Sequence, residues 1–212
     1  MGGTERCVAL ASGTVEFQDV VRRRRMIRQF RADPVPEHSI DRLLHNATRG
    51  PSAGFSQGQA FLVLQDEADL DTFWTIASDA AGDTVRTAPL VIVPMSCKRV
   101  YLDRYAQPDK GWTDRDEAHW PVPFWLIDTG MAALLILLTA VDERLGALYF
   151  GIVPEAVAPF REAFGVPEDN EPIGAIAIGY DAETEKRDLS SRRRPLDDVV
   201  HHGRWGQGRA SR

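Results

Sequence analysis

The sequence predicts an α+β fold in which helices flank a mixed β-sheet. Short apolar runs, typical of buried strands, are interleaved with segments whose apolar residues recur at helical spacing. These elements do not follow the regular strand–helix–strand order of a parallel α/β protein, which favours a mixed sheet. A chain of 212 residues, 43% of them hydrophobic, is long enough to bury one core. We therefore expect a single domain over residues 14–205, with short tails at residues 1–13 and 206–212.

Two helices are predicted before the first strand. Thr14 is a candidate N-cap for a helix over residues 15–21, which leads into a run of arginines. The segment Asp33–Pro36 then breaks the chain, because proline cannot continue a helix. A second helix is predicted to end at Gly50-Pro51. The residues on its apolar face recur at helical spacing and are Ile40, Leu43, Leu44 and Ala47.

The middle of the chain is predicted to contain two buried strands, at residues 60–64 and 88–94, with a helix over residues 70–81 between them. Residues 98–123 show no period, and we expect them to form an irregular lid or substrate loop. Four aromatic residues in this segment are candidates for binding a substrate by stacking. They are Tyr101, Tyr105, Trp112 and Trp120.

A long and almost entirely apolar helix is predicted over residues 125–145. A helix that is apolar on every side must be buried on every side, and a domain of this size offers little room for that. We therefore expect a subunit interface to cover part of it. Its apolar run Met131–Ala140 is too short to span a bilayer. A strand at residues 147–152, a helix at 155–164 and a strand at 172–180 complete the predicted domain.

Composition excludes several classes of function. A net charge of -6 argues against a general nucleic-acid-binding protein. Cys7 and Cys97 form neither a disulfide framework nor a metal-type spacing, and the N-terminus lacks a secretory signal, so we predict a cytoplasmic protein. The five histidines show no metal-ligand spacing, and no metal site is predicted. Glycine-rich dinucleotide or phosphate loops and a nucleophile elbow are missing from the sequence.

Positive charge is concentrated in two arginine clusters, Arg22–Arg25 with Arg28, and Arg192–Arg194. The guanidinium fork matches phosphate oxygens in two-point contact, and a positive group also stabilises a reduced flavin. The alternative for each cluster is a solvated basic surface. The apolar residues Leu196, Val199 and Val200 predict that the second cluster is docked. If the two clusters converge, they form a pocket for a flat, phosphorylated ligand such as flavin mononucleotide (FMN).

One polar loop, Pro51–Gln57, is a second candidate for binding such a ligand. Its serine hydroxyls, backbone amides and glutamine follow directly after a helix. They can hydrogen-bond the edge of a heteroaromatic ring, and Gly54 permits a close approach. The alternative is an ordinary polar connection between a helix and a strand.

Taken together, these segments resemble the nitroreductase family of flavin enzymes, over roughly residues 17–205. The matching motifs, in chain order, are Arg24-Arg25-Met26-Ile27-Arg28-Gln29-Phe30, Pro34-Val35-Pro36, Pro51-Ser52-Ala53-Gly54-Phe55-Ser56-Gln57-Gly58-Gln59, Leu145-Gly146-Ala147-Leu148-Tyr149-Phe150-Gly151 and Arg193-Arg194-Pro195-Leu196-Asp197-Asp198-Val199-Val200-His201. Each motif alone is weak, but their order and spacing together are specific.

The resemblance implies a three-layer α/β/α sandwich with a mixed, mainly antiparallel sheet, which forms an intertwined homodimer with FMN at the subunit interface. It implies that NAD(P)H reduces FMN, which then reduces a nitroaromatic, a quinone or a similar small acceptor by a ping-pong mechanism. No side chain is expected to act as a catalytic acid or base. The residues that it implies for FMN binding are Arg24, Arg25, Met26 (by its backbone), Arg28, Pro51, Ser52, Ala53, Gln57, Phe150, Gly151, Arg193 and Arg194.

Three departures from the family pattern affect this site. Met26 replaces a serine, Phe55 an asparagine, and Gly58-Gln59 a Pro-Trp pair. We expect Phe55 to line the acceptor site together with Tyr101, Tyr105, Trp112 and Trp120. Other chemistry on reduced flavin, such as dehalogenation or consumption of the flavin itself, and a deazaflavin in place of FMN are alternatives. A non-catalytic flavin carrier and an electrostatic binding module are two further ones.

Overall fold

An antiparallel sheet forms the centre of the computed structural model. Its strands are β1 (Gln59–Leu64), β2 (Leu90–Ser96), β3 (Gly146–Phe150), β4 (Glu171–Pro172) and β5 (Ala175–Gly179). They are arranged in the order β1-β2-β5-β3, with β4 also paired to β2, and every one of these pairs is antiparallel. A parallel bridge joins Met26 to Ala147 of β3. The predicted mixed, mainly antiparallel sheet is therefore confirmed.

The structure describes residues 16–77, 81–185 and 188–208. The chain divides after Ala182 into two compact units, and the sheet lies in the first of them. We describe each unit by itself. The predicted N-cap Thr14 and Cys7 lie outside the described residues.

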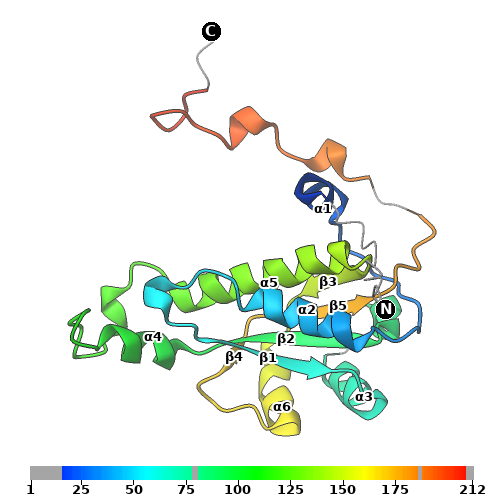
Figure 1. Ribbon diagram of the computed structural model, residues 1–212, viewed down its shortest axis with the longest axis horizontal. Helices are drawn as coiled ribbons and strands as arrows, with labels where there is room; N and C mark the ends of the chain where they lie inside the picture. The colour runs from blue at the N-terminus through cyan, green and yellow to red at the C-terminus, as the bar shows by residue number, and fades with distance from the viewer. Residues whose placement is uncertain (1–15, 78–80, 186–187, 209–212) are drawn as a thin grey trace, which may run out of the picture. The chain divides into compact units, whose positions relative to one another are not determined.

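Helices cover both faces of the sheet, which gives the three predicted layers (Figure 1). On one face lie α2 (Glu37–Ala47) and α5 (Phe124–Asp142), and on the other lie α3 (Glu67–Ile76) and α6 (Pro154–Phe164). Successive side chains of a strand point to opposite faces. Accordingly, Leu90 and Ile92 of β2 pack in the core beneath α2 and α5, while Val91 and Val93 pack with α3 and α6.

The helix α5 has more apolar surface than its own chain covers. It packs against α2 and the sheet, where Ile136 and Ala140 are fully buried. Ile127, Met131 and Leu134 on its outer side stay exposed, Leu134 by 48%. Among the described helices, α5 is the one long and apolar enough to cross a bilayer, but half of its most apolar window is buried in the protein. These contacts make it a core helix with one uncovered side.

Several elements differ from the sequence prediction. Residues 98–123 are not irregular throughout, because α4 (Lys98–Tyr105) and a 3-10 turn (Glu117–His119) form within them. The helix was missed because its polar and aromatic residues do not segregate onto one apolar face: buried Tyr101 is followed by charged and half-buried neighbours. The lid role of the segment stays a prediction.

Two predicted strands also differ in detail. β1 lies at the edge of the sheet, so only Leu64 is fully buried and Ala60 is exposed. The strand expected at residues 172–180 is divided into β4 and β5. The break falls at Gly174, whose φ of +148° is a conformation that side chains rarely adopt.

The second unit, which begins at Glu183, contains two short 3-10 turns, Ser190–Arg192 and Leu196–Asp198. Within the unit, Arg194 Nη2 donates to the carbonyl of Asp198 at 2.9 Å. Leu196 is 72% exposed, and Val199 and Val200 are exposed as well. These three side chains are therefore not buried by the residues of their own unit, so this unit by itself does not provide the predicted docking.

Replacing Gly146 by alanine is expected to destabilise the fold by about 1–3 kcal/mol, because the new Cβ would lie 2.8 Å from the Ile27 side chain and overpack the contact. Urea denaturation measures the free energy of unfolding. Gly50→Ala is the control, since a Cβ there makes only ordinary contacts, with 3.4 Å to the nearest atom. Equal stabilities of the two variants would contradict the predicted tight packing at Gly146.

Candidate flavin site

The arginine segment that follows α1 (Phe17–Arg23) is held by backbone hydrogen bonds along the sheet. The Ile27 amide donates to the Ala147 carbonyl at 3.0 Å. Farther along, the Arg31 amide donates to Tyr180 O at 2.9 Å, and the Ala182 amide to Gln29 O at 3.0 Å. Residues 24–31 are therefore hydrogen-bonded along the edge of the sheet. These main-chain bonds fix the backbone positions of the arginines.

Arg24 has one guanidinium nitrogen without a partner among the described residues. Its Nη1 atom is buried and makes no hydrogen bond to any described residue. A buried donor without an acceptor is costly, so such an atom indicates a missing acceptor. Arg25 instead forms an ion pair with Asp181, and Arg28 Nη1 donates to the Met26 carbonyl at 3.3 Å.

Met26 and Phe150 offer backbone rather than side chains at this site. The Met26 thioether packs against both hydrophobic cores and accepts a weak hydrogen bond from the Tyr149 amide at 3.5 Å. The Phe150 ring is buried and stacks on Trp74, with ring centroids 5.7 Å apart. Gly151, the next residue, is exposed and has open space where a side chain would be. A ligand can therefore approach the backbone of Gly151 on the side where a Cβ would stand.

The loop Pro51–Gln57 contains a 3-10 turn, Ala53–Phe55, and has an unusual backbone. Gly54, Phe55 and Gln57 all have positive φ values, between +54° and +59°. Phenylalanine rarely adopts this conformation, which costs a side-chain-bearing residue roughly 1–2 kcal/mol. The turn presents the Phe55 side chain to solvent, 75% exposed. Backbone strain of this kind is often associated with functional sites.

Two residues of other helices hold this loop. The carboxylate of Asp128 in α5 accepts from the Ala53 amide at 2.8 Å and from the Tyr101 hydroxyl at 3.0 Å. Arg104 of α4 donates from Nε to the Gly54 carbonyl at 3.0 Å. Burial, followed by the hydrogen bond to Asp128, raises the pKa of Tyr101 above its ordinary range. These contacts attach the loop to α4 and α5.

The aromatic residues predicted to bind a substrate form one cluster beside the loop. Trp120 contacts Tyr105 and Trp112, with ring centroids 4.4 and 5.4 Å away. Tyr105 also lies against Gly54, where a Cβ would be 2.7 Å from its ring. Tyr101 is fully buried beneath the cluster. Its ring is therefore a packing residue in this structure and is not placed to stack on an acceptor.

The arginine segment and the Pro51–Gln57 loop do not meet within one chain. The loop is bound to Asp128 near the start of α5, whereas Met26 pairs with β3, which begins just after α5 ends. The part of α5 between Asp128 and Asp142 spans roughly 21 Å at about 1.5 Å per residue. Arg193 and Arg194 lie in the second unit, whose placement relative to the first is not described.

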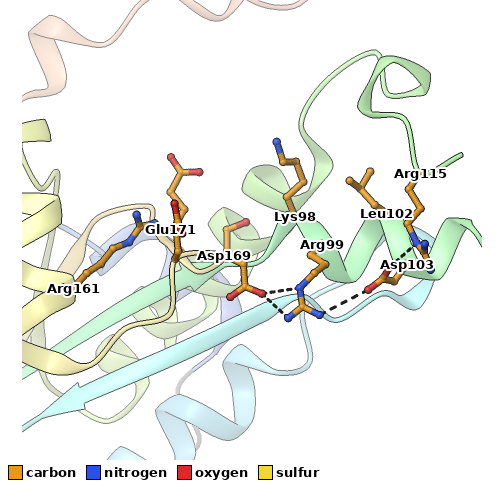
Figure 2. Close-up of a pocket in the computed structure, with 10 residues that line it drawn as sticks. Lys98, Arg99, Leu102, Asp103, Arg115, Arg161, Asp169 and Glu171 are labelled. Carbon is orange, nitrogen blue, oxygen red and sulfur yellow. Dashed lines mark hydrogen bonds and ion pairs between the residues drawn. The ribbon is translucent and has the colours of Figure 1, made fainter.

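A charged pocket of about 560 Å³ lies beside α4 and is lined by Lys98, Arg99, Arg115, Arg161 and Glu171, among others (Figure 2). Arg99 pairs with Asp169, with Nε 2.7 Å from the carboxylate, and lowers the pKa of that carboxyl. Arg115 pairs with Asp103 at 2.8 Å. Arg161 donates from Nη2 to the Asn170 carbonyl at 3.0 Å, and its buried Nε atom has no partner among the described residues. The lining contains as many carboxylates as cations, however, so the pocket offers little net positive charge for a phosphate.

Comparison with known proteins identifies the family. The model of the nitroreductase family matches residues 21–81 and 76–180. The chain belongs to the nitroreductase family. It is an oxidoreductase of that family. A relative from Methanothermobacter thermautotrophicus, assigned as an NADH dehydrogenase/NAD(P)H nitroreductase, is 30% identical over 91% of both chains.

Two further proteins are similar to this chain, one in sequence and one in fold. An NADPH-dependent oxidoreductase of Staphylococcus aureus is 24% identical over 88% of this chain and 73% of its own. The crystal structure of a protein from Exiguobacterium sibiricum, assigned as a nitroreductase and solved in complex with FMN, has the same fold. Its TM-score is 0.71, with 21% identity over 89% of this chain and 97% of that one.

Sequence reasoning missed three residues that support the candidate loop: Asp128, Arg104 and the hydroxyl of Tyr101. Asp128 carried a signal, since it is an acid within an apolar helix and is only 4% exposed. A buried carboxylate requires hydrogen-bond donors, but the sequence does not show which donors meet it. Arg104 and Tyr101 carried no comparable signal, because α4 itself was not predicted.

Replacing Tyr101 by phenylalanine is expected to lower stability at pH 7 by about 1 kcal/mol, through loss of the hydrogen bond to Asp128. Because the pKa of Tyr101 is raised in the folded protein, wild-type stability is retained below about pH 10 and falls as the pH rises further. Tyr101→Phe has no hydroxyl to ionise at this position and does not lose stability in this way. The free energies of unfolding of wild type and Tyr101→Phe therefore converge above about pH 10.

Urea unfolding followed from pH 7 to about pH 11 tests this behaviour, across the ordinary tyrosine pKa. The half-buried Tyr180 supplies the control variant, Tyr180→Phe, which keeps the wild-type slope. A difference between wild type and Tyr101→Phe that stays constant with pH would show that Tyr101 does not titrate as expected.

Proposed function

We propose that this protein binds FMN and transfers hydride from NAD(P)H through FMN to a nitroaromatic, quinone or similar small acceptor by a ping-pong mechanism. The observation that carries the proposal is the buried Nη1 of Arg24, which lacks a partner among the described residues. An anionic phosphate or the electron-rich edge of a flavin supplies the acceptor that this donor needs. The FMN-bound relative and the NAD(P)H-dependent relatives support the same cofactors.

The residues present fit FMN in chemistry. Arg24 and Arg28 lie on the segment that is hydrogen-bonded to the sheet, and Arg28 contacts the Met26 carbonyl. They are proposed to hold the phosphate, the ribityl chain and the N1–O2 edge, with the backbone of Met26 between them. The space beside Gly151 permits a close approach, and its amide is proposed to meet the N5–O4 edge. Arg25 joins them if its pairing with Asp181 is shared with the ligand. Arg193 and Arg194 are proposed to close on the phosphate.

When bound, FMN supplies the chemistry, because it accepts and donates hydride. The protein's own contribution is placement: the arginines supply a positive field, and the loop residues Pro51, Ser52, Ala53 and Gln57 supply hydrogen bonds and an apolar edge. Solvent can deliver protons to the acceptor. The exposed Phe55 and the neighbouring Tyr105, Trp112 and Trp120 are proposed to sort acceptors by stacking.

A homodimer, proposed here, completes this site. The loop and the arginine segment of one chain are far apart along α5, so a second copy is needed to bring the loop beside the arginines. The exposed side of α5, with Ile127, Met131 and Leu134, provides an apolar surface for that copy. A pocket of about 360 Å³ between α1, α2 and α5, lined by Phe17 and Leu138 among others, continues this surface. A cytoplasmic location is part of the proposal.

The variant Arg24→Ala is expected to raise the FMN dissociation constant about 10- to 100-fold, since a hydrogen bond to a charged group contributes about 1.5–3 kcal/mol. Flavin fluorescence titration of apoprotein measures it. Arg22→Ala is the matched control, because Arg22 is 74% exposed and pairs with Asp19. Colourless purified protein that binds no FMN on titration would refute the proposed function.

Placing a charge on the uncovered side of α5, by Met131→Asp or Leu134→Asp, is expected to produce monomers with at least about 10-fold weaker FMN binding, because a buried unpaired charge is costly at an interface. Sedimentation velocity and flavin titration provide the readouts. Thr72→Asp, on the exposed side of α3, adds the same charge elsewhere and should remain dimeric. Monomers that bind FMN as wild type would contradict a site shared between chains.

A further inference from the structure

We infer that Asp128 is a positioning residue, which holds the Pro51–Gln57 loop in its strained conformation so that the loop is ready to bind FMN. This inference rests on the proposed function for the identity of the ligand. The loop's attachment to Asp128 can nevertheless be tested on protein that carries no flavin.

The contacts of Asp128 are directed at the loop and its support. One carboxylate oxygen, Oδ2, accepts both from the Ala53 amide at 2.8 Å and from the Tyr101 hydroxyl at 3.0 Å. The residue is 4% exposed, on a helix whose neighbouring buried positions are apolar or hydroxyl side chains. Burying a carboxylate is unfavourable, and an apolar residue at this position would serve packing alone equally well. Its hydrogen bonds are therefore the reason for an acid here.

The loop needs such an attachment because its backbone is strained. Phe55 and Gln57 lie in the left-handed region with φ values of +54° and +55°. Internal hydrogen bonds define the turn itself: the Gln57 amide donates to Ser52 Oγ at 3.1 Å, and Ser56 Oγ donates to the Ala53 carbonyl at 2.6 Å. These bonds move with the loop, however, and do not attach it to the rest of the protein.

Attachment comes from three directions. Asp128 binds the start of the turn, Arg104 binds the Gly54 carbonyl at 3.0 Å, and the Cys97 amide binds the Gly58 carbonyl at 2.8 Å. The ring of Tyr101 lies directly against Gly58, where a Cβ would be 2.5 Å away. Asp128 thus holds the loop directly. Through the hydroxyl of Tyr101 it also holds the tyrosine ring against which the loop packs. Strained conformations persist where surrounding contacts over-determine them.

The test compares Asp128→Asn with Asp128→Ala. The amide oxygen of asparagine can still accept from Ala53 and Tyr101, whereas alanine cannot. In flavin-free protein, hydrogen exchange of the peptide covering residues 51–58 is expected to be at least tenfold faster in Asp128→Ala and near wild type in Asp128→Asn. The FMN dissociation constant is expected to rise about tenfold in Asp128→Ala, which corresponds to about 1.4 kcal/mol, and less than threefold in Asp128→Asn.

Thr129→Val is the matched control for general destabilisation. Thr129 is the next residue of α5, fully buried, and donates to the Trp125 carbonyl at 2.7 Å without contacting the loop through that bond. This variant should lose stability while exchange at residues 51–58 and FMN affinity stay as in wild type. If Asp128→Asn and Thr129→Val both keep near-wild-type exchange at residues 51–58 and near-wild-type FMN affinity, the effect of Asp128→Ala comes from the lost hydrogen bonds to the loop. General destabilisation of the fold would not explain it.

Three results overturn the inference. The first is wild-type exchange at residues 51–58 in Asp128→Ala, and the second is an increase there that Thr129→Val reproduces. The third is FMN binding by Asp128→Ala that is as tight as in wild type. If instead wild-type protein binds no FMN, the proposed function fails, and the exchange data still decide whether Asp128 holds the loop. If wild type binds FMN and Asp128→Ala binds it equally tightly with a loosened loop, the positioning role fails while the proposed function stands.

Discussion

The apolar character of α5 is the constraint on which the rest of the structure depends. One side of this helix covers the sheet, where Leu90, Ile92 and Ile176 lie beneath it and α2 in a single core. The other side, with Met131 and Leu134, is not covered by the described part of the chain. The same helix separates the two candidate binding segments, since Asp128 holds the loop near its start and β3 begins after its end. The packing of the core and the proposed assembly of two chains thus both depend on α5.

The strands and most helices were predictable from the sequence, because an element that packs in or on the sheet needs apolar residues at regular spacing. Leu90 to Pro94 read as a buried strand and form most of β2, and the spacing of Ile40, Leu43 and Ala47 correctly predicted the buried face of α2. The helix α4 was not predictable in this way. Its single fully buried residue, Tyr101, is held by contacts with distant segments, and such contacts leave no periodic pattern.

The sequence predicted which residues belong to the candidate site better than it predicted how they are arranged in space. The arginines and the Pro51–Gln57 loop are visible as motifs, because the first are concentrated positive charge and the second is polar and contains proline and glycine. The sequence does not show that Arg25 is paired with Asp181, while Arg24 retains a buried nitrogen that no described residue pairs with. It also does not show that Phe150 turns its ring into the core. Both depend on the three-dimensional position of residues far away in the chain.

The attachment of residues 24–31 to β3 and to the end of β5 has a consequence beyond ligand binding. An exposed strand edge presents unsatisfied amides and carbonyls and tends to recruit other chains. Along β3 that edge is covered in part by the segment around Ile27, through its bond to Ala147. A truncated or nicked chain lacking this segment would leave the edge open to self-association. The arginines of this segment therefore also lie on a stretch of chain that protects the edge of the sheet from aggregation.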